Sequence, residues 1–226
     1  MKKNNSYLLD LIKSQKDNFS LDQSFYTNKS IFEMDLKTFF FNQWVFVGHI
    51  SRIKNKGDYF LFSICEESII IIRENEDKIN AFYNVCRHRG SHICLEEEGR
   101  VRKFVCPYHA WNYDLSGKLL KARMMDDNFK PKNWSLKKCN CIVFEGLIFI
   151  NLSENASDFQ NFINPIEDFI KLNGLGKAKI AARKIYPTKG NWKLTLDNFH
   201  ECYHCQPSHP EYCSVHDREY VMAYGA

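Results

Sequence analysis

The sequence lacks any long hydrophobic run. Its longest apolar stretches, residues 68–72 and 146–150, are far shorter than the ~20 residues of a membrane-spanning helix. The N-terminal apolar patch at residues 7–12 is interrupted by Asp10 and has neither the long core nor the small-residue cleavage site of a signal peptide. We therefore expect no membrane span and a cytoplasmic location.

A strong charge of one sign is also missing. The 226 residues include 31 Lys and Arg against 27 Asp and Glu, a net charge of +4, and the two signs alternate along the chain. Proteins that bind nucleic acid gather basic residues on one face, so this pattern argues against a nucleic-acid partner. With 44% hydrophobic and 26% charged residues, the chain is expected to form one large or two modest globular domains.

Cysteine, by contrast, is plentiful. Nine cysteines in a sequence without a secretion signal are more typical of metal ligands or buried thiols than of disulfides. An odd number also cannot be fully paired. The spacing of the cysteines therefore has to show which of them matter.

Short β-rich runs fill the centre of the chain, separated by turn signals at residues 56–58, 75–77 and 116–117. This density of short strands predicts a small antiparallel sandwich or barrel at residues 44–152. Residues 1–43 are expected to be a helical N-terminal segment. The expected strands are residues 44–50, 59–64, 68–73, 79–85, 103–105, 112–114 and 141–151.

The pattern changes again after residue 152. Residues 158–172 predict an amphipathic helix with a possible kink at Pro165. A strand is expected at residues 179–186, and a helix at residues 192–205 that stops near Pro207. Residues 153–226 therefore make a third segment, and the fold class is α+β.

Two matched segments are the strongest feature of the sequence. Cys86 and His88 are separated by one residue, Cys106 and His109 by two, and 17 residues lie between His88 and Cys106. Each segment thus offers one thiolate and one imidazole. A Rieske [2Fe–2S] centre takes two cysteines on one iron and two histidines on the other, which two such loops would supply. A structural zinc site is the alternative, although zinc spacings usually pair cysteines with cysteines and histidines with histidines.

The residues around these ligands resemble the Rieske motif. Asn84-Val-Cys-Arg-His-Arg-Gly90 and Cys106-Pro-Tyr-His-Ala-Trp111 are similar to the cluster loops of the Rieske non-haem iron oxygenases. One departure is Ala110, where the family more often has Gly. The resemblance implies an all-β Rieske domain of antiparallel strands after N-terminal helices, followed by the start of a helix-grip catalytic domain.

The cysteines beside the loops bear on the reduction potential. High-potential Rieske proteins have an extra cysteine in each loop, and the two form a disulfide. Here Cys94 follows the first loop, but no cysteine lies beside Cys106 in the second. We therefore predict no disulfide between the loops and a potential near the low end of the Rieske range, roughly −150 mV. A measured potential well above zero would contradict this.

A second candidate site lies within residues 191–210. His204 and His209 are five residues apart, and on a helix Glu201 would share a face with His204. Two neutral histidines with one carboxylate suit ferrous iron and leave positions for oxygen. Cys202 and Cys205 also form a Cys-x-x-Cys pair, which either packs against the helix or has a redox role.

This segment resembles the iron-binding helix of the Rieske oxygenase catalytic domain. On that resemblance His204 and His209 are iron ligands and Asn198 lies near the metal. Glu201 takes the place of the acid that links an iron-bound histidine to a Rieske histidine of the neighbouring subunit. Glu at this position looks like the members that oxidise quaternary ammonium compounds, the carnitine, glycine betaine and choline type monooxygenases and demethylases.

The resemblance also implies the cofactors and partners. These are a [2Fe–2S] cluster, a mononuclear Fe(II), a separate flavin and iron–sulfur reductase that draws on NAD(P)H, O2, a small organic substrate, and a head-to-tail homotrimer. The family's third iron ligand is an acid far downstream. None of the acids after His209 (Glu211, Asp217 and Glu219) matches that position, so a C-terminally truncated oxygenase is expected. The alternative is a Rieske electron-transfer module without oxygenase chemistry.

Overall fold

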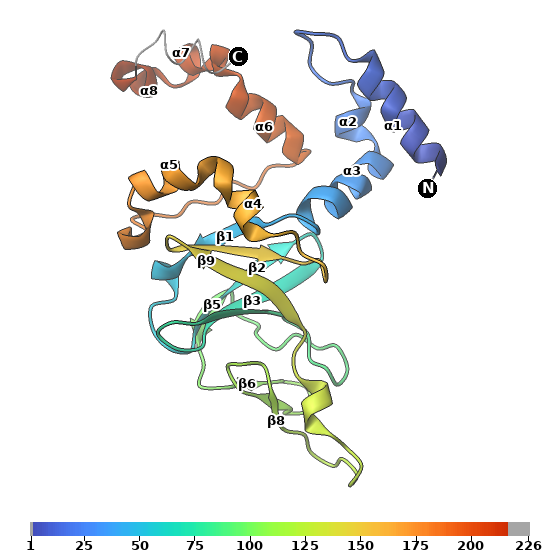
Figure 1. Ribbon diagram of the computed structural model, residues 1–226, viewed down its shortest axis with the longest axis vertical. Coiled ribbons are helices and arrows are strands. Elements are labelled where there is room, and N and C mark those ends of the chain that lie inside the picture. Colours follow the sequence, from blue (N-terminus) through green and yellow to red (C-terminus); the bar gives the residue numbers. More distant parts are fainter. Residues whose placement is uncertain (1, 217–226) are drawn as a thin grey trace. The chain divides into compact units, whose positions relative to one another are not determined.

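The computed structural model describes residues 2–216, with the side chains of residues 6–201 and 203–216. The chain forms two compact units (Figure 1). The central unit runs from Leu36 to Arg183, and the discontinuous unit combines the chain up to Asp35 with the chain from Lys184 onward. In the part described, no helix is long and apolar enough to cross a bilayer. The domain boundaries expected at residues 43 and 152 stay a prediction.

The central unit is built on antiparallel strands, which confirms the predicted all-β domain. A small sheet of β6 (Phe104–Val105), β7 (Asn112–Tyr113) and β8 (Leu119–Lys121) lies next in sequence to the second Cys–His loop. The larger, seven-stranded sheet has the spatial order β1 (Val45–His49), β10 (Leu147–Asn151), β9 (Lys138–Phe144), β4 (Ile79–Tyr83), β3 (Glu67–Arg73), β2 (Asp58–Ile64) and β5 (Glu98–Arg100).

Strand β3 separates two hydrophobic cores. Its four consecutive isoleucines are all fully buried, and successive side chains of a strand point to opposite faces. Ile70 and Ile72 accordingly pack in the cluster that contains Cys86 and Cys106. The other two isoleucines, Ile69 and Ile71, pack in a second cluster on the other face. The two cysteines are therefore held in a rigid, apolar interior.

The expected single strand at residues 141–151 is wrong. The segment contains the end of β9, a turn and the whole of β10, and the two strands pair as a hairpin from Phe144–Leu147 to Asn140–Asn151. The turn between them is Glu145-Gly146, with φ of 46° and 77°. Two successive positive φ values are those of the tight hairpin turns that match the twist of β strands. The continuous β propensity of the flanking residues concealed this turn.

The helix predicted at residues 158–172 is confirmed, including its interruption at proline. The Asp158 carboxylate caps α4 (Phe159–Ile163) by accepting the Asn161 N–H at 3.0 Å. A 3-10 turn, η4 (Asn164–Ile166), then contains Pro165 and leads into α5 (Glu167–Leu172). After the short turn η5 (Leu175–Lys177), residues 178–189 form neither helix nor strand, so the predicted strand at 179–186 is wrong. These residues are exposed and no described strand pairs with them, so most of their backbone is open to water, while the Ile180 N–H donates to the Ser51 hydroxyl at 3.4 Å.

The discontinuous unit consists of helices. Its N-terminal part contains α1 (Lys2–Ser14), α2 (Ser24–Thr27) and α3 (Lys29–Asp35), which confirms the predicted helical segment. Its C-terminal part contains α6 (Trp192–His200), η6 (Cys202–His204), α7 (Cys205–Ser208) and α8 (Pro210–Val215). The helix expected over residues 192–205 therefore breaks at Glu201, which has an extended conformation.

The two parts of this unit are joined by a buried ion pair and an exposed hydrogen bond. The Lys193 ammonium of α6 forms an ion pair with the Asp35 carboxylate of α3, and both side chains are largely buried. The Tyr26 hydroxyl donates a hydrogen bond of 2.5 Å to Asp197, and burial followed by that carboxylate raises the pKa of Tyr26 to about 12. The N-terminal helices thus brace α6, the helix that precedes His204.

Candidate functional site

The two Cys–His loops share one backbone turn. In each loop the cysteine N–H donates to the carbonyl five residues later, and the cysteine carbonyl accepts from the N–H four residues later. The bonds are Cys86 N to Ser91 O (2.8 Å), Gly90 N to Cys86 O (3.0 Å), Cys106 N to Trp111 O (2.8 Å) and Ala110 N to Cys106 O (2.9 Å). The same turn therefore presents Cys86 and His88 in one loop and Cys106 and His109 in the other.

The residue four positions after the cysteine has a left-handed backbone in both loops. Gly90 has φ of 74° and Ala110 has φ of 56°. Glycine adopts this conformation freely, whereas a Cβ brings steric strain. The departure noted at Ala110 therefore falls on the one kind of backbone position where glycine is favoured, and it leaves the turn itself intact.

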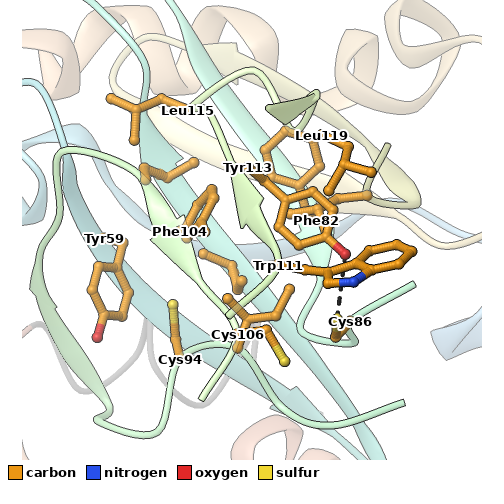
Figure 2. Packing of buried hydrophobic residues seen from close by; sticks show 14 residues of the cluster. Tyr59, Phe82, Cys86, Cys94, Phe104, Cys106, Trp111, Tyr113, Leu115 and Leu119 are labelled. Carbon is orange, nitrogen blue, oxygen red and sulfur yellow. Dashed lines mark hydrogen bonds between the residues drawn. The ribbon is translucent and has the colours of Figure 1, made fainter. Parts of the chain in front are cut away.

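The two cysteine thiols lie together in the interior. Cys86 is 3% exposed and Cys106 is 2% exposed (Figure 2). Burial raises the pKa of Cys86, and the neighbouring Cys106 raises it further, against the opposing effect of hydrogen bonds to Tyr113 and the backbone. A pair of desolvated thiols is stabilised as thiolates when a metal supplies positive charge.

The two imidazoles lie on the outer side of the loops. The rings of His88 and His109 have centroids 4.7 Å apart, and His88 stacks on Trp111 at 4.8 Å. His109 is exposed and contacts the ring of Tyr108, while burial followed by the charge of neighbouring groups lowers the pKa of His88. The His88 Nδ1 atom is buried and has no hydrogen-bond partner among the described residues. An unpartnered buried nitrogen is costly unless something such as a metal ion occupies it.

The four side chains fit a two-iron cluster. They form a buried thiol pair and an outward imidazole pair, and a [2Fe–2S] centre of the Rieske type needs two sulfur ligands on one iron and two nitrogen ligands on the other. Among the described side chains, those of residues 6–201 and 203–216, no three of Cys, His, Asp or Glu form a group that could hold a single metal ion.

Tyr113 contacts the first site and was not singled out in the sequence. Its hydroxyl lies 3.3 Å from the Cys86 sulfur and accepts the Arg87 N–H at 3.2 Å (Figure 2). Because the backbone already donates to this oxygen, its own proton is free to point at the sulfur. Burial followed by Cys86 raises the pKa of Tyr113, so the phenol keeps this proton. The one sequence signal for Tyr113 is its spacing of two residues from Trp111, which places both aromatic side chains on the same face of an extended segment.

The second candidate site is more open. The rings of His204 and His209 have centroids 5.5 Å apart, and a Glu201 carboxylate oxygen lies 3.6 Å from His204 Nδ1. That separation is too long for a hydrogen bond, and the buried His204 Nδ1 has no hydrogen-bond partner in the described chain. The helix ends before Glu201, so the turn η6 rather than a continuous helical face brings Glu201 to His204.

The other residues predicted near this site are less engaged. Asn198 is exposed on α6, and none of the hydrogen bonds or ion pairs seen among the described residues involves its side chain. Cys205 is buried, as the packing interpretation expects, while the side chain of Cys202 lies outside the described part. The structure therefore brings Glu201, His204 and His209 together but assigns no contact to Asn198.

Two family models match the chain. Residues 43–139 match the Rieske [2Fe-2S] domain, and residues 175–223 match the catalytic domain of the ring hydroxylating alpha subunit. The two matches cover the two candidate sites separately.

Known relatives match most of the chain. The glycine betaine monooxygenase oxygenase subunit of Pseudomonas aeruginosa is 39% identical over 203 residues, which is 89% of this chain and 47% of the relative. The carnitine monooxygenase oxygenase subunit of Escherichia coli K12 is 36% identical over 206 residues, 85% of this chain and 52% of the relative. The chain thus spans about half the length of the curated relatives it matches.

A solved structure agrees with these matches. It is a quaternary ammonium Rieske monooxygenase described in terms of carnitine oxidation by gut microbiota and inter-subunit electron transfer. Its TM-score is 0.77 at 34% identity, over 84% of this chain and 53% of that one. With a Rieske domain followed by the beginning of a ring-hydroxylating catalytic domain, the chain belongs to the Rieske oxygenase alpha subunits.

Proposed function

We propose that the chain is the electron-accepting and iron-binding part of an oxygenase that attacks a small quaternary ammonium compound. Cys86, His88, Cys106 and His109 hold a [2Fe–2S] cluster, and His204 and His209 hold a mononuclear iron. The observation that carries the proposal is the pair of matching loops, with thiols buried together and imidazoles directed outward. This division into pairs suits two irons better than one tetrahedral zinc ion.

The residues of the central unit would hold the cluster that transfers electrons. When bound, the cluster accepts and gives up one electron at a time. The exposed His109 and the half-buried His88 supply the side that faces solvent, where a reductase that uses NAD(P)H would approach. The apolar packing around Cys86 and Cys106 keeps water from the sulfur side, and the Tyr113 hydroxyl stabilises negative charge on Cys86.

The residues of the second site would hold the iron to which these electrons pass. Glu201, beside His204, would accept a hydrogen bond from that histidine and hold it in the orientation for iron. In a head-to-tail trimer, Glu201 would also meet a Rieske histidine of the neighbouring subunit, and the inter-subunit electron transfer described for the solved relative supports this role. Asn198 would lie near the metal, as the family resemblance implies.

The proposed reaction balances as a monooxygenation. O2, two electrons and two protons give one water, and the other oxygen atom is inserted into a C–H bond of the substrate. Where the carbon attacked lies beside the nitrogen, the hydroxylated product breaks its C–N bond and releases an amine and an aldehyde. The quaternary ammonium substrate is proposed from the glycine betaine and carnitine monooxygenase subunits.

An electron-transfer module is the second candidate function. It is favoured by the contrast between the two sites: all four proposed ligands of the first lie on two matching turns, whereas only two proposed ligands of the second, His204 and His209, lie in the described part of the chain. An electron carrier would need only the central unit, and the intact second segment has no place in it.

Iron content combined with EPR separates these functions. The 226-residue chain is purified anaerobically and reduced with dithionite. We expect a Rieske EPR signal, with two irons per chain for the module and three for the oxygenase part. A chain that holds zinc instead, or iron without the Rieske signal, would contradict the proposed cluster.

A further inference from the structure

We infer that Asn84 is a positioning residue. Its side-chain amide makes the backbone hydrogen bonds that a neighbouring β strand would otherwise make, and it thereby fixes the loop that carries Cys86 and His88. The inference rests on the proposed cluster. It concerns a residue that binds no metal in the proposed site and that is wholly buried.

The two loops differ in what closes them. The second loop lies between β6 and β7, which pair through Phe104–Tyr113 and Val105–Asn112. The first loop follows β4, but residues 91–97 after it contain no strand. The next strand, β5, pairs with β2 instead. Backbone pairing therefore holds both ends of the second loop, and it cannot do the same for the first.

The side chain of Asn84 supplies the absent pairing. Its Oδ1 accepts the N–H groups of Ile93 (3.0 Å) and Cys94 (2.9 Å). Its Nδ2 donates to the Cys94 carbonyl (2.8 Å) and to the Ser68 hydroxyl on β3 (3.2 Å). An amide side chain has two donors and one oxygen with two lone pairs, so all four of its hydrogen bonds are made. These are bonds that the backbone of a neighbouring strand would offer.

Asn84 also occupies a position from which this clamp controls the ligands. Its backbone N–H donates to the Ser68 carbonyl at 2.8 Å, so both the backbone and the side chain are anchored to β3. Cys86 comes two residues later, and the clamp joins the start of the loop to its end at Ile93 and Cys94. Without it, three buried backbone groups lose their partners, and the loop would move to find water.

A matched control exists in the same unit. Asn151 is also wholly buried; its Nδ2 donates to the Asn42 carbonyl (3.1 Å) and its Oδ1 accepts the Ser153 N–H (2.8 Å). It joins segments that carry no proposed ligand. Asn84→Ala and Asn151→Ala therefore each remove a wholly buried amide, which makes four hydrogen bonds in the first case and two in the second, and only the first acts on a cluster loop.

The test compares these variants in the full 226-residue chain. The readouts are the EPR g values, the reduction potential, and the rate of iron loss to a chelator at a temperature where each variant is folded. We expect Asn84→Ala to shift the g values and the potential and to lose iron about tenfold faster, because all four hydrogen bonds of the clamp are lost together. Asn151→Ala should lower the melting temperature while its g values and potential stay those of the wild type.

A milder variant covers the case in which Asn84→Ala does not fold. Ser68→Ala removes one of the four bonds of the clamp, and we expect a smaller acceleration of iron loss, about threefold, with a shift of the g values in the same direction. Wild-type g values and potential in a folded Asn84→Ala chain, or in Ser68→Ala if the first does not fold, would overturn the inference while the cluster stands. A wild-type chain without a Rieske signal would overturn the cluster and, with it, this role.

Discussion

The two candidate metal sites differ in how they are built. The first takes its four side chains from two short turns between residues 86 and 109, and local hydrogen bonds and buried packing fix both turns. The second takes His204 and His209 from the turns after an exposed helix, and its nearby acid stays 3.6 Å from His204. The four proposed ligands of the first site therefore lie on two matching turns of one unit, whereas only two proposed ligands of the second lie in the described part of the chain.

The largest expected effect is the complete loss of the metal cluster at the first site. Cys106→Ser removes one of the two buried sulfur ligands, and we expect total loss of the Rieske EPR signal, because a hydroxyl is a poor ligand for iron–sulfur iron. Cys65→Ser, at an exposed cysteine between β2 and β3, is the control and should keep the signal. A retained signal in Cys106→Ser would refute this ligand assignment.

The next effect concerns the support of the second site alone. Lys193→Met leaves the buried Asp35 carboxylate without its partner, and breaking such a pair costs about 3–5 kcal/mol. We expect faster hydrogen exchange in α6, measured by mass spectrometry, while the Rieske signal is unchanged. The double variant Lys193→Met/Asp35→Leu removes both charges and should restore most of the protection. Equal exchange in the wild type and the single variant would show that the pair does not brace α6.

A smaller expected effect changes the reduction potential of the first site while the cluster stays bound. Tyr113→Phe removes the hydroxyl proton that points at Cys86, and this bond favours the reduced, more negative cluster. We expect the reduction potential to fall by on the order of 60 mV, the equivalent of one charge-assisted hydrogen bond in a one-electron couple. Tyr59→Phe is the control, because this tyrosine lies in the same core beside Cys94 rather than Cys86. Equal potentials in the wild type and Tyr113→Phe would exclude this tuning.

The smallest expected effect is a change in the free energy of unfolding, with opposite signs for the two loops. Ala110→Gly relieves a left-handed backbone, and we expect it to raise the free energy of unfolding by about 1 kcal/mol, roughly 2–4 °C in melting temperature. Gly90→Ala should lower it by a similar amount, because a Cβ at Gly90 would meet no atom within 4 Å and only the backbone is strained. Calorimetry of both variants checks the pair. Changes of the same sign would show that the turns are not equivalent.

Features that depend on residues close together in the sequence were mostly predicted correctly. The spacing of cysteines and histidines, the turn glycines and the helix break at Pro165 are local signals, and the fold and family that they indicated are confirmed. The hairpin turn at Glu145-Gly146 was missed although its signal was present, because β propensity on both sides concealed it.

Contacts between distant residues could not be predicted in this way. Lys193 and Asp35 are separated by 158 positions, and residues of either type are usually exposed. Tyr113 and Asn84 are both fully buried polar side chains, and their hydrogen bonds become apparent only when the packing of the strands is known. These residues support the candidate sites because they are buried. Whether a residue is buried depends on the whole fold and cannot be read from its neighbours in the sequence.

The link between Lys193 and Asp35 has a consequence for the order in which the chain folds during synthesis. All of the central unit lies between these two residues, so it can complete its own contacts while the N-terminal helices still lack their partner. At roughly 5–20 residues per second, the ribosome needs about 10–30 s to go from Asp35 to Lys193. For that interval the N-terminal helices are already synthesised, whereas Lys193, the partner of Asp35, is not yet part of the chain.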